Sequence, residues 1–147
     1  MKLLIPLLAL SIVATSPIVI RDTNMVHRQE TVQTQKFVLL SFSGSDWCVP
    51  CIRMKEQIFN SEVFISYATA QLTLINADFP RLKKNQLSAE QVKKNEELAD
   101  KYNKEGKFPF TLLLDANGKV LKQWDGLPPE SAEAFVEELK SILNAGS

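Results

Sequence analysis

Hydrophobic and polar positions along the chain predict four strands after residue 36. Phe37 to Phe42 is a short, nearly unbroken apolar run, which is typical of a strand buried on both faces at the centre of a sheet. Leu72 to Ala77 predicts a second buried strand. Phe110 to Leu114 and Val120 to Trp124 flank a turn with Asn-Gly at its tip, and this pattern predicts a hairpin.

Helical spacing of apolar residues predicts four helical segments between and after these strands. The first runs from Ile52 to Asn60, and a shorter one runs from Ser61 to Ala70. Ser88 and Gln91 predict a capping box that opens the third helix, and Gly106 predicts its end. The last helix is amphipathic, with apolar positions at Ala132, Phe135, Val136, Leu139, Ile142 and Leu143.

The order of these elements predicts the fold class. Strands that alternate with helices pair in parallel and are covered on both faces, and the hairpin adds antiparallel strands to the same sheet. We expect an α/β three-layer sandwich, with a mixed central sheet of four to five strands flanked by helices. A chain of 147 residues, 45% of them hydrophobic, is large enough to bury a core without a structural disulfide or metal.

The first 20 residues differ from the rest of the chain. Met1-Lys2 gives a basic start, and Leu3 to Ala14 is almost entirely apolar and is followed by small residues. This pattern predicts a signal peptide over residues 1–20 and export to the periplasm; an uncleaved membrane anchor and a buried N-terminal element are the alternatives. Residues 21–36 predict a polar linker or a first element, and residues 37–147 predict the folded domain.

The charge pattern excludes several classes of partner. The 17 basic and 17 acidic residues balance, and the Lys and Arg residues are dispersed along the chain. This pattern contains no basic region for nucleic acid or for an anionic lipid surface, so we expect no charge-driven partner. A membrane is an expected partner only if the N-terminal segment stays uncleaved.

The two cysteines of the chain form one motif, Cys48 to Cys51 (Cys-Val-Pro-Cys), where the first strand passes into the first helix. A closed zinc site needs about four ligands, and two cysteines with the single histidine, His27, cannot supply them. Covalent haem attachment requires a histidine after the second cysteine, where Ile52 stands. A disulfide across two residues removes little chain entropy. The motif therefore predicts redox chemistry without a metal or a cofactor.

Position in the chain gives the two thiols different predicted roles. Cys48 stands at the helix start, where free N–H groups and the positive end of the helix dipole stabilise a thiolate, so Cys48 is the predicted nucleophile. Cys51 follows one turn later and, we expect, lies deeper, where it resolves the mixed disulfide. Pro50 suits the first turn, and Val49 brings no charge that strongly favours the thiolate, which indicates a reductase.

Two segments resemble the thioredoxin superfamily: Phe42 to Cys51, and Lys107 to Thr111 followed by the Asn-Gly hairpin. The resemblance covers residues 37–143 in element order. Among the subgroups, the chain is most similar to exported thioredoxin-like domains, including the periplasmic C-terminal domain of transmembrane thiol-reductant transporters. The resemblance implies a thioredoxin-like sandwich. It also implies a cis bond before Pro109, which would face the cysteines and leave the main chain of Phe108 free to pair with a substrate strand.

The resemblance also implies a set of substrate-binding residues around the cysteines: Trp47, Val49, Pro50, Phe108 and Pro109. Trp47 lines and rigidifies the rim of the site, or is only a half-buried aromatic residue at a strand end. For Pro109 the alternative is an ordinary trans proline at a strand start, and for Phe108 it is a core side chain.

The chain departs from the resemblance on the strand before the motif. Thioredoxins place a buried Asp there as the proton acceptor for the resolving cysteine, and this strand has Ser41 and Phe42 instead. Asp46, on the loop, is a candidate substitute. Lys55, one turn beyond Cys51, either influences the thiols or belongs to a solvated helix face.

The predicted function is a thiol:disulfide oxidoreductase that reduces protein disulfides in an exported compartment, with a dithiol/disulfide cycle at Cys48 and Cys51. Expected partners are protein disulfide substrates and a thiol electron donor, such as a membrane reductant transporter. A disulfide oxidase or isomerase is one alternative. A non-catalytic peptide-binding module is the other, because function follows poorly from a fold.

Overall fold

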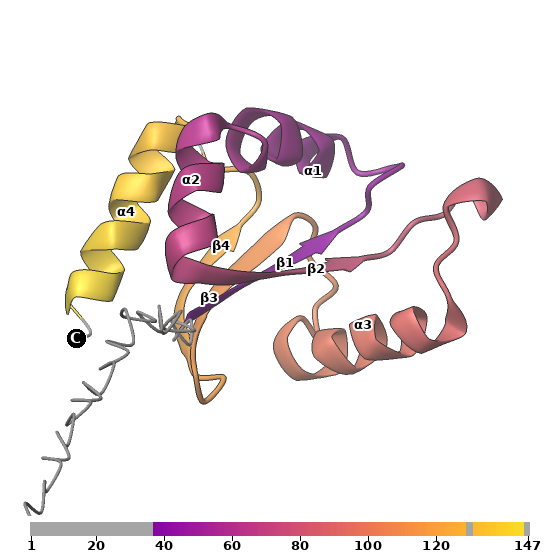
Figure 1. The fold of residues 1–147 in the computed structure, drawn as a ribbon. Helices are drawn as coiled ribbons and strands as arrows, with labels where there is room; N and C mark the ends of the chain where they lie inside the picture. The colour runs from indigo at the N-terminus through magenta and orange to yellow at the C-terminus, as the bar shows by residue number, and fades with distance from the viewer. Residues whose placement is uncertain (1–36, 129–130, 146–147) are drawn as a thin grey trace, which may run out of the picture. The chain divides into compact units, whose positions relative to one another are not determined.

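The computed structural model describes residues 37–128 and 131–145. The predicted signal peptide, the polar segment 21–36 and His27 lie outside the described residues, so what the sequence predicts for them stays a prediction. No helix in the described part of the chain is long and apolar enough to cross a membrane. The described residues form one sheet with helices on both of its faces (Figure 1).

The first strand lies inside the sheet, as its apolar run predicts. β1 (Phe37–Ser43) pairs in parallel with β2 (Leu72–Asp78) and antiparallel with β3 (Phe110–Asp115). β3 then pairs antiparallel with β4 (Val120–Asp125). The order β2-β1-β3-β4 is the predicted mixed sheet, with four strands in the described residues.

The strand register decides which loops meet at the end of β1. Ser43 pairs with Asp78 of β2, and Phe42 pairs with Phe110 of β3. The loop after β1, the loop after β2 and the segment before β3 therefore all lie at the same end of the strands. The cysteine motif lies on the first of these three segments.

β2 is an edge strand of the described sheet, so the prediction of a buried strand is wrong. Leu72 and Ala77 are buried, but Leu74 is 54% exposed and Ile75 is 37% exposed. An apolar run reports hydrophobicity but not the number of neighbours that pair with the strand, and therefore it does not separate a central strand from an edge strand. β1 is both apolar and central, because residues 39–42 are all buried and a strand pairs with it on either side.

Helices cover both faces of the sheet, which confirms the three-layer α/β class. α1 (Val49–Met54), α2 (Glu62–Gln71) and α4 (Ala132–Ala145) lie on one face, and α3 (Ala89–Tyr102) lies on the other (Figure 1). Lys55–Phe59 continue α1 as a π-helical turn. The predicted helices thus form, with the first one divided between two helical geometries.

The strands alternate their side chains between two cores. Leu39 and Leu113 enter the core beneath α2 and α4, whereas Leu40 and Leu112 enter the core that α3 covers. Each of these four leucines is at most 2% exposed. Burial on both faces of β1 and β3 holds the end of β1, and hence the cysteine motif, in a fixed position.

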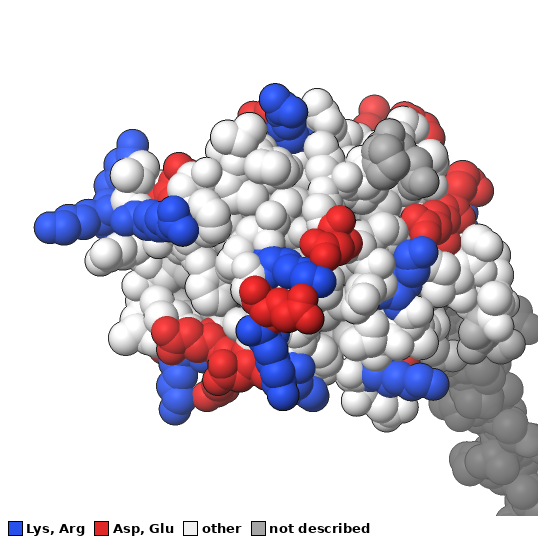
Figure 2. Space-filling model, turned by 180° about the vertical axis from the view of Figure 1, so that it is seen from behind, with Lys and Arg blue, Asp and Glu red and all other residues white. Residues whose placement is uncertain are grey.

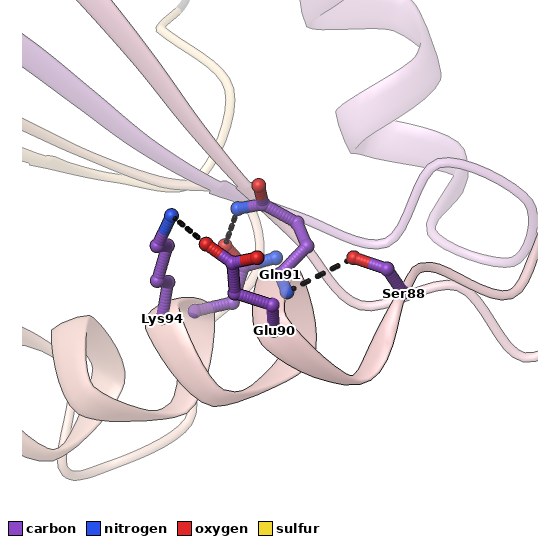
Figure 3. A network of polar contacts seen from close by, with 5 residues as sticks. Ser88, Glu90, Gln91 and Lys94 are labelled. Carbon is purple, nitrogen blue, oxygen red and sulfur yellow. Dashed lines mark hydrogen bonds and ion pairs between the residues drawn. The ribbon is translucent and has the colours of Figure 1, made fainter.

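The start of α3 is capped, but only half of the predicted capping box forms. Ser88 Oγ accepts a hydrogen bond from the Gln91 N–H at 3.2 Å. The Gln91 side chain does not return to Ser88, because its Nε2 donates to Asn95 Oδ1 at 2.8 Å (Figure 3). Asn95 is 1% exposed and needs partners for its polar atoms, and its Nδ2 donates to the Asp78 carbonyl. The helix ends at Tyr102, before Gly106.

Candidate active site

Cys48 and Cys51 form a disulfide at the start of α1. The Sγ atoms are 2.02 Å apart and the Cα atoms are 5.2 Å apart. Cys48 is the N-cap residue of the helix, and its Sγ accepts a hydrogen bond from the Cys51 N–H at 3.3 Å. The predicted location of the motif, where a strand passes into a helix, is confirmed. The same N–H is placed to stabilise a thiolate on Cys48 after reduction.

The two cysteines are equally buried in this disulfide form, each 5% exposed, so the expectation that Cys51 lies deeper is wrong here. Val49, 56% exposed, and the exposed Pro50 lie between them. The exposed residues of the motif are therefore the two that separate the cysteines.

The bond between Phe108 and Pro109 is cis, as the resemblance implies. Pro109 is buried and lines, together with Cys51, a pocket of about 260 Å³ between α1 and the strands β1 and β2. The Pro109 carbonyl accepts a hydrogen bond from the Gly126 N–H at 2.9 Å. Within the described residues, no hydrogen bond engages the main chain of Phe108. The structure therefore brings Pro109 to the cysteines and leaves the Phe108 main chain available.

Trp47 joins the cysteine motif to two other segments. Its Nε1–H donates to the Phe79 carbonyl at 2.7 Å, and its ring packs edge-on against Phe108 with centroids 5.4 Å apart. The guanidinium carbon of Arg81 lies 3.8 Å from the centroid of the Trp47 ring. Trp47 is half-buried beyond the end of β1, and its role as a substrate-binding residue stays a prediction.

Gly44 makes room for this tryptophan. Its main-chain carbonyl accepts a hydrogen bond from the Cys48 N–H at 2.9 Å, which closes the turn before the motif. A Cβ atom at residue 44 would collide with the indole of Trp47. The turn and the tryptophan therefore require glycine at this position, a steric requirement that the sequence analysis did not identify.

The family follows from the match of the chain with known proteins. The profile of the family described as Thioredoxin-like domain matches residues 27–142. The disulfide bond reductase DsbH of Chlamydia pneumoniae is 39% identical over 115 residues, which cover 78% of this chain and 67% of that protein. The chain belongs to the thioredoxin-like family.

Solved structures agree with the family and the fold. A structure of the DsbH oxidoreductase matches this thioredoxin-like protein with a TM-score of 0.68 at 40% identity, over 76% of this chain and 75% of that chain. The reduced C-terminal domain of Neisseria meningitidis DsbD matches with a TM-score of 0.50 at 19% identity, over 74% of this chain and 82% of that one, a likeness of fold alone. The family and the disulfide together make this protein a thiol:disulfide oxidoreductase.

The thioredoxin-like protein uses Asp46 as a structural anchor. Its carboxylate accepts hydrogen bonds from the Arg81 N–H and the Leu82 N–H, both at 2.9 Å, and from Asn85 Nδ2 at 3.0 Å. The hydrogen bond from the Arg81 main chain lowers the pKa of Asp46 below its ordinary value, and the Leu82 and Asn85 bonds act in the same direction. An ionised carboxylate already engaged by three donors is a poor proton acceptor, which contradicts the suggested role for Cys51.

Asp78 is a second anchor of the thioredoxin-like site that the sequence analysis missed. Its carboxylate accepts from Ser43 Oγ at 3.0 Å, from the Ser45 N–H at 2.8 Å and from Ser45 Oγ. A carboxylate at the end of β2, paired in register with Ser43 at the end of β1, was the available signal in the sequence. Each aspartate thus holds the loop that belongs to the other strand: Asp46, on the loop after β1, binds the loop after β2, and Asp78, at the end of β2, binds the loop after β1.

The pocket beside Cys51 contains hydroxyl groups in place of a carboxylate. Ser41 lines it at 7% exposure, and Thr111 Oγ1, fully buried behind it, lies 3.5 Å from Ser41 Oγ. Lys55 is exposed and lines the same pocket. In the part of the chain that the structure describes, no Asp or Glu side chain lines this pocket, and no cluster of His, Cys, Asp and Glu could hold a metal ion.

Proposed function

We propose that this thioredoxin-like protein reduces protein disulfides, with Cys48 as the nucleophile and Cys51 as the resolving thiol. The observation that carries the proposal is the hydrogen bond from the Cys51 N–H to Cys48 Sγ, because after reduction this N–H is placed to stabilise a thiolate on Cys48. The name of the relative from Chlamydia pneumoniae, a disulfide bond reductase, favours the same direction.

The proposed cycle transfers two electrons to the substrate. The Cys48 thiolate attacks one sulfur of the substrate disulfide, so that a mixed disulfide forms and the first substrate thiolate leaves and takes a proton. Cys51 then loses its proton and attacks the Cys48 sulfur, which releases the second substrate thiolate. The protein is left with the Cys48–Cys51 disulfide, and an external dithiol must return two electrons and two protons before the next cycle.

The substrate strand binds, in this proposal, along the main chain of Phe108. That main chain is free of hydrogen bonds within the described residues, and an extended peptide can pair with it. Pro109 closes the inner side of the site, while Val49 and Pro50 present an exposed surface. In this proposal Trp47 supports the rim and does not donate to the substrate, because its indole N–H already donates to the Phe79 carbonyl.

Solvent that enters the pocket beside Cys51 accepts its proton in the resolving step. The pocket holds about 260 Å³, and Ser41, Ser43 and Asn76 give it a polar wall that can orient a water molecule. The Asp46 carboxylate is engaged by the loop after β2, and no carboxylate of the described residues lines the pocket. Water therefore has the place that a buried aspartate has in thioredoxins.

The decisive test measures reduction of a protein disulfide with dithiothreitol as the electron source. We expect Cys48→Ser to lose activity and Cys51→Ala to accumulate mixed disulfides on Cys48. The reduction potential decides the direction, because a value near ~−270 mV supports a reductase and one near ~−120 mV an oxidase. Full activity of Cys48→Ser would overturn the proposal. A failure of the wild-type protein to reduce protein disulfides would also overturn it, and a non-catalytic peptide-binding role would then replace it.

The compartment and the electron donor belong to the same proposal. The apolar N-terminal run supports export to the periplasm, and a membrane reductant transporter is the proposed donor. Fractionation of cells that express the full chain tests the first point. The mass of the mature protein decides whether residues 1–20 are removed or stay as an anchor.

A further inference from the structure

Three cations lie close together on the loop that follows β2. Arg81, Lys83 and Lys84 fall within four residues, and the sequence from Phe79 to Ala89 contains no Asp or Glu. All three side chains are exposed. The even balance of charge over the whole chain concealed this local excess.

The same loop is fastened beside the disulfide. The Asp46 carboxylate accepts hydrogen bonds from the main chain of Arg81 and Leu82 and from Asn85 Nδ2. The Arg81 guanidinium packs on Trp47, the residue next to Cys48. Because Asp46 and Trp47 also precede the motif directly, the loop and the disulfide are held in a fixed relation.

The cations of this loop have no acidic partners in the described residues. The ion pairs of the described chain involve Lys93, Lys94, Lys107, Lys122 and Lys140. The carboxylates of Asp46 and Asp78 accept hydrogen bonds from main-chain N–H groups and from Ser and Asn side chains. In Figure 2 basic side chains project at the left edge, on the side where this loop lies after the turn of the view, and one acidic side chain lies beside them.

We infer that this loop is a docking surface for acidic side chains that flank the substrate disulfide. The inference rests on the proposed reductase function and adds the substrate class. Exposed cations that make no ion pair, held at a fixed place, raise the local concentration of an acidic segment and orient it, and this effect weakens as salt is added. The partner is therefore a protein with Asp or Glu within a few residues of its exchangeable disulfide.

The test compares three peptides that share one intramolecular disulfide and differ only in the flanking residues, which are Asp, Ser or Lys. The full chain reduces them with dithiothreitol as the only donor, so no donor protein can contribute to the preference. We expect kcat/KM for the Asp peptide to exceed that for the Lys peptide by ~10-fold or more at low salt, and to approach it at ~0.5 M salt. Equal kcat/KM for the Asp and Lys peptides at low salt would overturn the inference.

Charge reversal locates the effect. Lys83→Glu and Lys84→Glu are each expected to lower the Asp-to-Lys preference by ~3-fold or more. Lys119→Glu makes the same change of charge and is the matched control. Lys119 lies in the turn after Asp115, and Asp115 pairs with Phe37 at the opposite end of β1 from the cysteine motif. An equal loss in Lys119→Glu would show an effect of net charge and overturn the docking surface.

The design separates the two proposals. If wild type fails to reduce the Ser peptide, the proposed function fails. If wild type reduces the Ser peptide but shows no charge preference, only the docking inference fails. Circular dichroism and thermal unfolding of each variant show whether a lost preference comes from a lost fold.

Discussion

Asp46 and Arg81 bind each other through the main chain and not through their charges. Asp46 Oδ1 accepts a hydrogen bond from the Arg81 N–H at 2.9 Å, while the guanidinium of Arg81 lies over Trp47. The carboxylate therefore holds the loop without neutralising its cation. This relationship connects the residue before the Trp-Cys pair to a segment 35 positions later.

We predict that acid removes the contribution of Asp46 to stability. The pKa of Asp46 is lower in the folded protein than its ordinary value, so folding favours the ionised form. The stabilisation is present above the unfolded pKa of ~3.9 and is lost as the pH falls through the folded pKa. In urea unfolding, the free energy of unfolding of Asp46→Asn should be lower than that of wild type at pH 7. In strong acid the two values should be equal.

The control for this prediction is Asp100→Asn, at an exposed position of α3. Its unfolding midpoint should follow that of wild type across the same pH range. A constant difference between wild type and Asp46→Asn down to strong acid would contradict the role given to the ionised carboxylate.

Gly44→Ala should displace Trp47, because the new methyl group would occupy the position of the indole. We expect a loss of about 1–3 kcal/mol of unfolding free energy, as for other overpacked sites. A changed tryptophan emission and a several-fold lower kcat/KM should accompany it. The same substitution in a Trp47→Ala background should have a much smaller effect, and equal effects in both backgrounds would show that the collision is not the cause.

Asn95→Leu should destabilise the protein by about 1–3 kcal/mol, since it removes the buried Asn95 amide and leaves the part-buried Asp78 carbonyl without its donor. Gln91→Ala removes only the hydrogen bond to Asn95 Oδ1 and should cost about 1 kcal/mol or less. Chemical denaturation of both variants measures the two values. The reverse order would mean that Asn95 is not the link between α3 and the end of β2.

Leu113 and Leu74 should respond differently to truncation although both lie in strands. Leu113 is 0% exposed, so Leu113→Ala should cost about 2–5 kcal/mol. Leu74 is 54% exposed on β2, and Leu74→Ala should cost less than about 1 kcal/mol. A loss at Leu74 as large as that at Leu113 would restore the prediction of a buried second strand.

The strand and helix order could be predicted from the sequence because it depends on local periodicity. The apolar run at Phe37–Phe42 and the Asn-Gly turn each report the conformation of neighbouring residues. The half-formed capping box at Ser88 shows the limit of such signals, since a buried Asn95 from the next turn takes the Gln91 side chain. The local sequence pattern does not predict which of several polar groups in a packed core will form a given hydrogen bond.

The sequence by itself determined the chemistry of this protein, because two cysteines separated by two residues at a helix start are constrained by local covalent geometry. Only the tertiary structure decided how the site is held and what surrounds it. Asp46 and Asp78 each accept hydrogen bonds from a segment more than 30 residues away. The Arg81 guanidinium lies over Trp47, the residue next to Cys48, on a loop that also carries Lys83 and Lys84. Such contacts depend on strand register and packing, because they form only when distant segments are brought to the same end of the sheet's strands.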